Sequence, residues 1–152
     1  MPSTSTKKTR GVALITGAST GFGRLIAETM ARNGYTVFAT MRGLAGKNAQ
    51  AAAELRDLAS RESLDLHPLE LDVTQEDSVN RAVAAAVEKA GRIDIVINNA
   101  GYGVMGVTEA VTLEQAQRIM DTNFFGVVRV NVDSHAVKII RSRFASSEGF
   151  LP

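Results

Sequence analysis

A glycine-rich run near the N-terminus is the first place where residue types and spacing can support chemistry. It reads TGASTGFG over residues 16–23, with glycines at positions 17, 21 and 23. The apolar segment 12–15 precedes it, and a stretch of helical periodicity follows from Gly21. Glycines let a backbone turn approach phosphate closely, and a helix N-terminus adds unpaired N–H groups and partial positive charge. The run therefore predicts a dinucleotide site, with a purely structural turn as the alternative.

A cation stands where the adenosine ribose of such a ligand is normally recognised. An acidic residue about 20 residues after the glycine run usually binds the ribose hydroxyls of NAD. Here that position is Thr40, and Arg42 follows two residues later with no Asp or Glu nearby. A guanidinium can form charge-assisted hydrogen bonds with a 2′-phosphate, and the Ser19 hydroxyl can add a contact. The pattern favours NADP(H) over NAD, the alternative being that Arg42 is a solvated surface charge.

The elements that must position these residues alternate between strand and helix patterns. Apolar and β-branched runs predict strands at 12–15, 35–40, 64–71 and 93–98. Pro68 interrupts the third strand and places it at or near a sheet edge. Helical periodicity predicts helices over 21–33, 45–61, about 74–90 and from 112 onward to about 141. Alternating strands and helices imply parallel pairing and helices on both faces, which is a doubly wound, Rossmann-like α/β domain.

Two helix starts carry recognisable signals. Thr74 precedes Gln75, Glu76 and Asp77, a pattern typical of an N-cap followed by an acidic first turn. Thr112 precedes Gln115 by three residues, which predicts a capping box.

These motifs resemble the short-chain dehydrogenase/reductase family over roughly residues 11–129. The spacing G-x-x-x-G-x-G after a Thr is the family's glycine signature. Asp72, in the sequence LDV, resembles the family's adenine-contacting Asp, and NNAG at 98–101 resembles the motif that lines its cofactor cleft. The resemblance implies strand order 3-2-1-4 and a cofactor-binding set of Gly17, Ser19, Thr20, Gly21, Phe22, Gly23, Arg42, Asp72, Val73, Asn99, Ala100 and Gly101.

The family's catalytic residues are a Ser, a Tyr with a Lys four residues later, and an Asn that positions a water. Asn123 matches the Asn, although it can also simply brace its helix against the fourth strand. Tyr35 and Tyr102 are followed four residues on by Ala39 and Gly106, so neither fits. A bare phenol, with a pKa of about 10, is poorly poised at neutral pH. We therefore expect Asn123 to be the one surviving member of the tetrad and the chain to be inactive or nearly so.

Three interpretations remain open at this stage. The chain is the NADP(H)-binding half of an oxidoreductase, a catalytically dead cofactor-binding module, or a product without function. The abrupt change after about residue 130 leads us to expect a truncated reading frame, with the strand at 93–97 left as an uncovered apolar edge. The same change predicts that the family's homo-oligomer interface is disrupted.

Composition and charge limit the other possibilities. The 152 residues are 45% hydrophobic with a net charge of +1, which gives no electrostatic case for nucleic acid. There is no cysteine, and two distant histidines predict no metal site. Apolar runs fall well short of ~20 residues, so we expect no membrane span and a cytoplasmic protein. The expected organisation is a flexible lead over 1–10, a cofactor-binding domain over 11–130 and an aberrant tail over 131–152.

Overall fold

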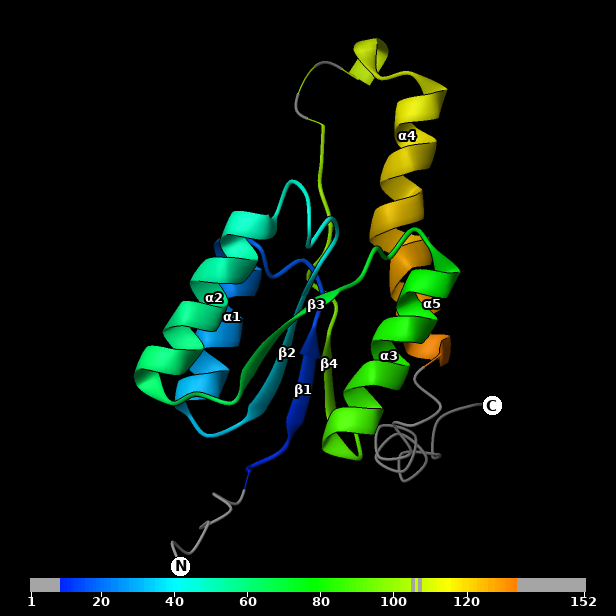
Figure 1. Ribbon diagram of the computed structural model, residues 1–152. Helices are drawn as coiled ribbons and strands as arrows, with labels where there is room; N and C mark the ends of the chain where they lie inside the picture. Colours follow the sequence, from blue (N-terminus) through cyan, green and yellow to red (C-terminus); the bar gives the residue numbers. More distant parts are fainter. Residues whose placement is uncertain (1–8, 105, 107, 134–152) are drawn as a thin grey trace, which may run out of the picture.

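The computed structural model describes residues 9–104, 106 and 108–133. Within them a parallel sheet has the strand order β3-β2-β1-β4, with helices on both faces (Figure 1). The strands are β1 (Val12–Ile15), β2 (Thr36–Met41), β3 (Leu66–Glu70) and β4 (Ile95–Ile97). The helical elements are α1 (Gly21–Arg32), α2 (Ala49–Glu62), α3 (Glu76–Ala90), η1 (Thr108–Ala110), α4 (Leu113–Met120), η2 (Asp121–Phe125) and α5 (Gly126–Asp133). The predicted doubly wound fold and the order 3-2-1-4 are confirmed.

The sheet is buried between two apolar layers. Side chains alternate along β1, so Leu14 packs with residues of α3 and α5 while Ile15 packs with residues of α1 and α2. Phe38 and Val37 of β2 divide in the same way between the two layers. β1 and β2 are buried along their whole length, as strands covered on both faces must be. This rigid centre holds the carboxyl ends of the strands at one end of the sheet, from which α4 projects outward (Figure 1).

Of the two predicted helix N-caps, the structure has one and lacks the other. The capping box at Thr112 is confirmed, because its side chain accepts from Gln115 N–H at 3.2 Å while the Gln115 Oε1 accepts from Thr112 N–H at 2.9 Å. The prediction that Thr74 caps α3 is wrong. Gln75 occupies that position without a side-chain cap, and the Thr74 hydroxyl donates to Asp72 Oδ1 at 2.8 Å. A carboxylate two residues away is the stronger local partner for that hydroxyl.

The expected flexible lead and aberrant tail are only partly within the described residues. Arg10 N–H, in the expected lead, donates to Gly34 O at 3.0 Å. The last described helix, α5, ends at Asp133, so the rest of the expected tail and the predicted helix end near 141 lie outside the described residues. β3 is at an edge of the sheet, as Pro68 indicates. No helix in the described part of the chain is long and apolar enough to span a bilayer.

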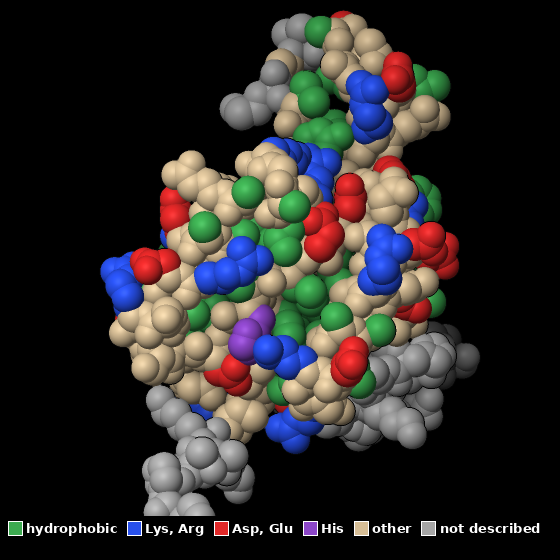
Figure 2. All heavy atoms as spheres, viewed as in Figure 1, with side chains coloured by type: hydrophobic (Ala, Val, Ile, Leu, Met, Phe, Trp, Pro, Cys, Tyr) green, Lys and Arg blue, Asp and Glu red, His purple; other side chains and the backbone are tan. Residues whose placement is uncertain are grey.

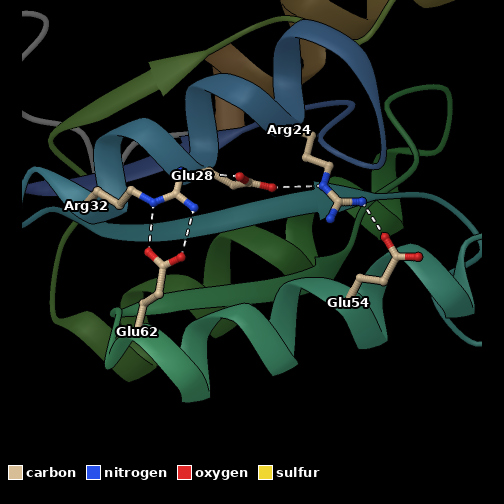
Figure 3. A network of polar contacts seen from close by, with 5 residues as sticks. All are labelled: Arg24, Glu28, Arg32, Glu54 and Glu62. Carbon is tan, nitrogen blue, oxygen red and sulfur yellow. Dashed lines mark hydrogen bonds and ion pairs between the residues drawn. The ribbon is translucent and has the colours of Figure 1, made fainter.

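An ion-pair network joins α1 to α2 (Figure 3). Arg32 donates to both Glu62 oxygens, at 2.8 and 3.1 Å. Arg24 donates to Glu54 at 2.6 Å and to Glu28 at 2.9 Å. Glu28 lies between the two arginines and reaches Arg32 at 3.4 Å. The network ties together the two helices that cover one face of the sheet. On the face in Figure 2 acidic and basic side chains are likewise interspersed.

The network predicts a specific acid sensitivity. A hydrogen bond from Arg24 lowers the pKa of Glu54, and one from Arg32 lowers the pKa of Glu62. A carboxyl with a lowered folded pKa stabilises the fold above its unfolded pKa, about 4.3, and this contribution is lost as pH falls through the folded pKa. Urea unfolding from about pH 5 to about pH 3 should therefore show a shallower loss of stability in the double variant Glu54→Gln/Glu62→Gln than in the parent.

The control is Glu88→Gln, which removes an exposed carboxylate of α3 that has no polar partner among the described residues. This variant should keep the parent's pH dependence. Parallel pH profiles for the parent and the double variant would show that the network contributes nothing to stability, as many exposed ion pairs do not.

Candidate functional site

A cleft of about 520 Å³ opens at the carboxyl ends of the strands, where parallel α/β sheets bind ligands. It is lined by Gly17, Ser19, Thr20, Phe22, Met41, Arg42, Lys47, Asn48, Leu71, Asp72, Val73, Thr74, Asn99, Ala100, Gly101, Tyr102 and Thr122. The structure thus brings together most of the residues assigned from sequence to cofactor binding. Gly21, Gly23 and Asn123 are not among the lining residues.

The glycine run is shaped by contacts between backbones. Gly17 has a φ of +67°, and a Cβ there would lie 2.8 Å from Ala100 Cα. A Cβ on Gly23 would lie 2.3 Å from Gly17 O and 2.4 Å from Asn99 Nδ2. Gly21 has a φ of +57° with nothing within 4 Å of such a Cβ. Gly17 and Gly23 therefore permit close packing between the loop and the segment after β4, while Gly21 serves the turn itself.

The N-terminus of α1 lies beside this loop, and no acidic side chain of its first turn competes for its N–H groups. Thr20 is its N-cap residue but makes no side-chain capping bond, and the first turn contains no acidic residue. The first N–H groups of a helix have no partner within the helix, so they remain available to an anionic ligand.

Thr16 joins the glycine loop to the segment that follows β4. Its buried hydroxyl oxygen accepts from Asn99 N–H and from Ala100 N–H, both at 3.0 Å. The Asn99 side chain donates in return to Thr16 O and Gly17 O, each at 3.0 Å. These four bonds hold the two sides of the cleft floor together.

The end of β2 carries the cations of the cleft. Thr40 is fully buried and its hydroxyl donates to Ile15 O at 2.9 Å, so this position contributes to structure and offers no carboxylate to a ribose. Arg42 is exposed and lines the cleft, as does Lys47 in the following turn. Sequence reasoning missed Lys47 and Asn48, because nothing in their spacing indicates that the turn brings them back beside Arg42.

The segment after β3 forms another wall. The Asp72 carboxylate accepts from the N–H and the hydroxyl of Thr74, at 3.0 and 2.8 Å. The Asp72 backbone N–H donates to Ser78 Oγ at 2.9 Å. Val73 is buried in the core layer beneath α5 and also lines the cleft. Asp72 is thus held by its own turn with one carboxylate oxygen engaged.

Asn123 lies in the π-helical turn η2 between α4 and α5. Its Oδ1 accepts from Tyr102 N–H at 3.1 Å, and its Nδ2 donates to Tyr102 O at 2.9 Å. Arg129 holds the same turn, donating to Asp121 Oδ1 at 2.6 Å and to the Val73 carbonyl at 3.2 Å. The Asn123 amide therefore pairs with the backbone after β4, a bracing arrangement, and the neighbouring Thr122 reaches the cleft.

The cleft contains a tyrosine, and the described residues contain no cluster of metal ligands. Tyr102 lines the cleft and is 43% exposed, with Gly106 rather than a Lys four residues later. In this part of the chain no three His, Cys, Asp or Glu side chains gather closely enough to hold a metal ion. The cleft therefore offers backbone donors, hydroxyls and two cations to an anionic ligand, beside the Asp72 carboxylate.

Comparisons with known proteins agree with this architecture. The sequence model for short chain dehydrogenase matches residues 11–138. A 3-ketodihydrosphingosine reductase of Bacteroides thetaiotaomicron is 38% identical over 119 residues, covering 78% of this chain and 39% of that protein. Human retinol dehydrogenase 8 is 37% identical over 120 residues, covering 77% of this chain and 36% of that protein. The chain spans about two-fifths of the length of these curated relatives.

Solved structures show the same fold. A variant of actinorhodin polyketide ketoreductase with NADPH superposes with a TM-score of 0.76 at 28% identity, covering 87% of this chain and 49% of that one. An alcohol dehydrogenase of Thermococcus sibiricus, complexed with 5-hydroxy-NADP, gives a TM-score of 0.71 at 31% identity. The match covers 82% of this chain and 51% of that one. Since the family model matches most of its length, this chain belongs to the short-chain dehydrogenase family.

Proposed function

We propose that residues 11–130 form the NADP(H)-binding domain of an oxidoreductase that transfers hydride between the nicotinamide and a carbonyl or alcohol. The observation that carries the choice of cofactor is the end of β2, where a buried Thr40 replaces the acid and Arg42 lines the cleft. A guanidinium attracts a ribose 2′-phosphate, and a nearby carboxylate repels it. The NADP(H) ligands of the two structural neighbours support the proposal.

The residues of the cleft fit the parts of this cofactor. Gly17, Ser19, Thr20 and Phe22 lie beside the uncapped N-terminus of α1, which suits the pyrophosphate. Gly21 and Gly23 shape that loop. Asp72 and Val73 suit the adenine, and Asn99, Ala100 and Gly101 suit the continuation toward the nicotinamide. Once bound, the cofactor would donate or accept the hydride, and these residues would bind and orient the cofactor.

Proton transfer is the part of the reaction that the 152 residues do not supply. They contain no Tyr-x-x-x-Lys sequence, and the amide of Asn123 is paired with the backbone of Tyr102. We therefore propose that this chain by itself binds cofactor with little or no turnover, and that Asn123 contributes by holding the cleft wall. Carbonyl reduction at a measurable rate by the purified chain would contradict this proposal.

The cofactor choice is tested by titrating NADPH and NADH and following nicotinamide emission. The chain has no Trp, so indole energy transfer does not complicate the signal. The parent should bind NADPH more tightly than NADH. Arg42→Ala should weaken NADPH binding by about tenfold and leave NADH nearly unchanged, because the lost charge-assisted hydrogen bonds reach only the 2′-phosphate.

The control is Arg56→Ala, which removes an exposed arginine of α2 that does not line the cleft. It should leave both affinities unchanged. Equal affinity of the parent for the two nucleotides, or an equal loss for both in Arg42→Ala, would overturn the preference for NADP(H).

A further inference from the structure

We infer that Lys47 is a second cation of the 2′-phosphate site, and that the turn over residues 43–48 holds it beside Arg42. The inference rests on the proposed NADP(H) function and adds a binding residue and its support. Lys47 and Arg42 are five residues apart in sequence, yet both line the same cleft together with Ser19 and Thr20.

Hydrogen bonds close the turn and fix the backbone from which the Arg42 and Lys47 side chains extend. Gly46 N–H and Asn48 N–H both donate to Gly43 O at 3.0 Å. The Asn48 amide Nδ2 donates to Arg42 O at 2.7 Å. Asn48 therefore binds the backbone of Arg42 from the position next to Lys47, and the two cations remain neighbours.

Gly43 makes the close return of the turn possible. Its φ is +64°, and a Cβ there would lie 3.2 Å from the Lys47 Cγ and 3.8 Å from the Lys47 Cε. The aliphatic part of Lys47 thus passes over the bare glycine backbone on its way to the cleft. A side chain at position 43 would displace Lys47 as well as strain the turn.

The carboxylate that binds this turn is engaged with its backbone. Glu70, at the end of β3, accepts from Gly43 N–H at 2.8 Å and from Leu44 N–H at 2.6 Å. Both of its oxygens thus bind the backbone of the turn, and Glu70 is not among the lining residues. Asp72, which does line the cleft, has one oxygen bound by Thr74. Neither Arg42 nor Lys47 has a polar side-chain partner within the described ranges, so both positive charges remain for a ligand.

Two unpaired cations suit a dianionic group better than a pair of ribose hydroxyls. A phosphate monoester carries about −1.5 to −2 charges at neutral pH and three acceptor oxygens. A ribose hydroxyl carries no charge and gains little from an ammonium. Lys47 should therefore contribute to affinity only when the 2′-phosphate is present, and added salt should weaken that contribution because both cations are exposed.

The test uses two nucleotides that differ only in the 2′-phosphate and need no nicotinamide site. Adenosine 2′,5′-bisphosphate and adenosine 5′-monophosphate are titrated calorimetrically into the purified full chain. Lys47→Gln should weaken binding of the bisphosphate by about five- to tenfold and leave the monophosphate within about twofold. Lys47→Arg should keep most of the affinity, because the charge is retained.

The matched control is Lys89→Gln, which removes an exposed lysine of α3 that is outside the cleft. It should change neither affinity. A Lys47→Gln variant that binds both nucleotides as the parent does, or that weakens both equally, would refute the role of Lys47 while the proposed function stands. A parent chain that binds neither nucleotide would refute the proposed function and this inference with it.

Discussion

A Gly23→Ala chain is expected to lose nucleotide binding and about 3 kcal/mol of its free energy of unfolding. In an open helix the same change would stabilise by about 1 kcal/mol, because alanine has the better helix propensity. Here the new Cβ would lie 2.3 Å from Gly17 O and 2.4 Å from the Asn99 amide nitrogen. One obstacle is backbone and the other is a side chain held by two hydrogen bonds, so neither can yield cheaply. The loop must move away from the segment after β4.

Urea unfolding and NADPH titration of the purified variant measure the two effects. Gly21→Ala is the matched control in the same loop, since no atom lies within 4 Å of its Cβ position. Its positive φ should cost only about 1 kcal/mol and leave the packing between loop and β4 intact. A Gly23→Ala chain as stable as the parent and still able to bind NADPH would contradict the close packing described here.

Thr16→Val is expected to destabilise the chain by about 2–4 kcal/mol and to weaken cofactor binding. Valine fills nearly the same volume as threonine, so no cavity forms. The loss comes from Asn99 N–H and Ala100 N–H, which both donate to the Thr16 hydroxyl at 3.0 Å and would lose their acceptor together. The segment that lines the cleft after β4 should then separate from the glycine loop.

Thr16→Ser distinguishes the contribution of the hydroxyl from that of the methyl group. It keeps the shared acceptor and removes one methyl, so it should cost only about 1 kcal/mol and retain cofactor affinity. Urea unfolding and NADPH titration report both variants. Equal losses in Thr16→Val and Thr16→Ser would assign the effect to packing and refute the role of the shared acceptor.

The sequence was informative wherever a signal is local or periodic. Alternating apolar runs predict the strands to within a few residues, and Pro68 predicts the edge position of β3. The capping box at Thr112 depends on four consecutive residues and was likewise predicted. Motif spacing also indicated most of the cleft, because residues that follow the carboxyl ends of parallel strands necessarily converge.

Features that depend on tertiary competition were not predictable in this way. Thr74 has the sequence of an N-cap, but its hydroxyl binds Asp72. Lys47 lines the cleft from a turn whose backbone is bound by Glu70, far along the chain. The π-helical turn at Asp121–Phe125 inserts a residue into the α4–α5 helix, and Arg129 donates to the Asp121 carbonyl and carboxylate at that turn. Each outcome depends on a partner that helical or strand periodicity does not reveal.

Pro68 has a consequence for how this sheet can associate. Val37 N–H donates to Asp65 O and Leu71 N–H donates to Met41 O, so the intervening even-numbered residues of β3 direct their backbone groups outward. Pro68 is the middle one and has no N–H, so an incoming strand would find a donor missing halfway along. In the described part of the chain β4 pairs only with β1, and it contains no proline. Pro68 thus makes the β3 edge a poorer template for an added strand than an uninterrupted edge would be.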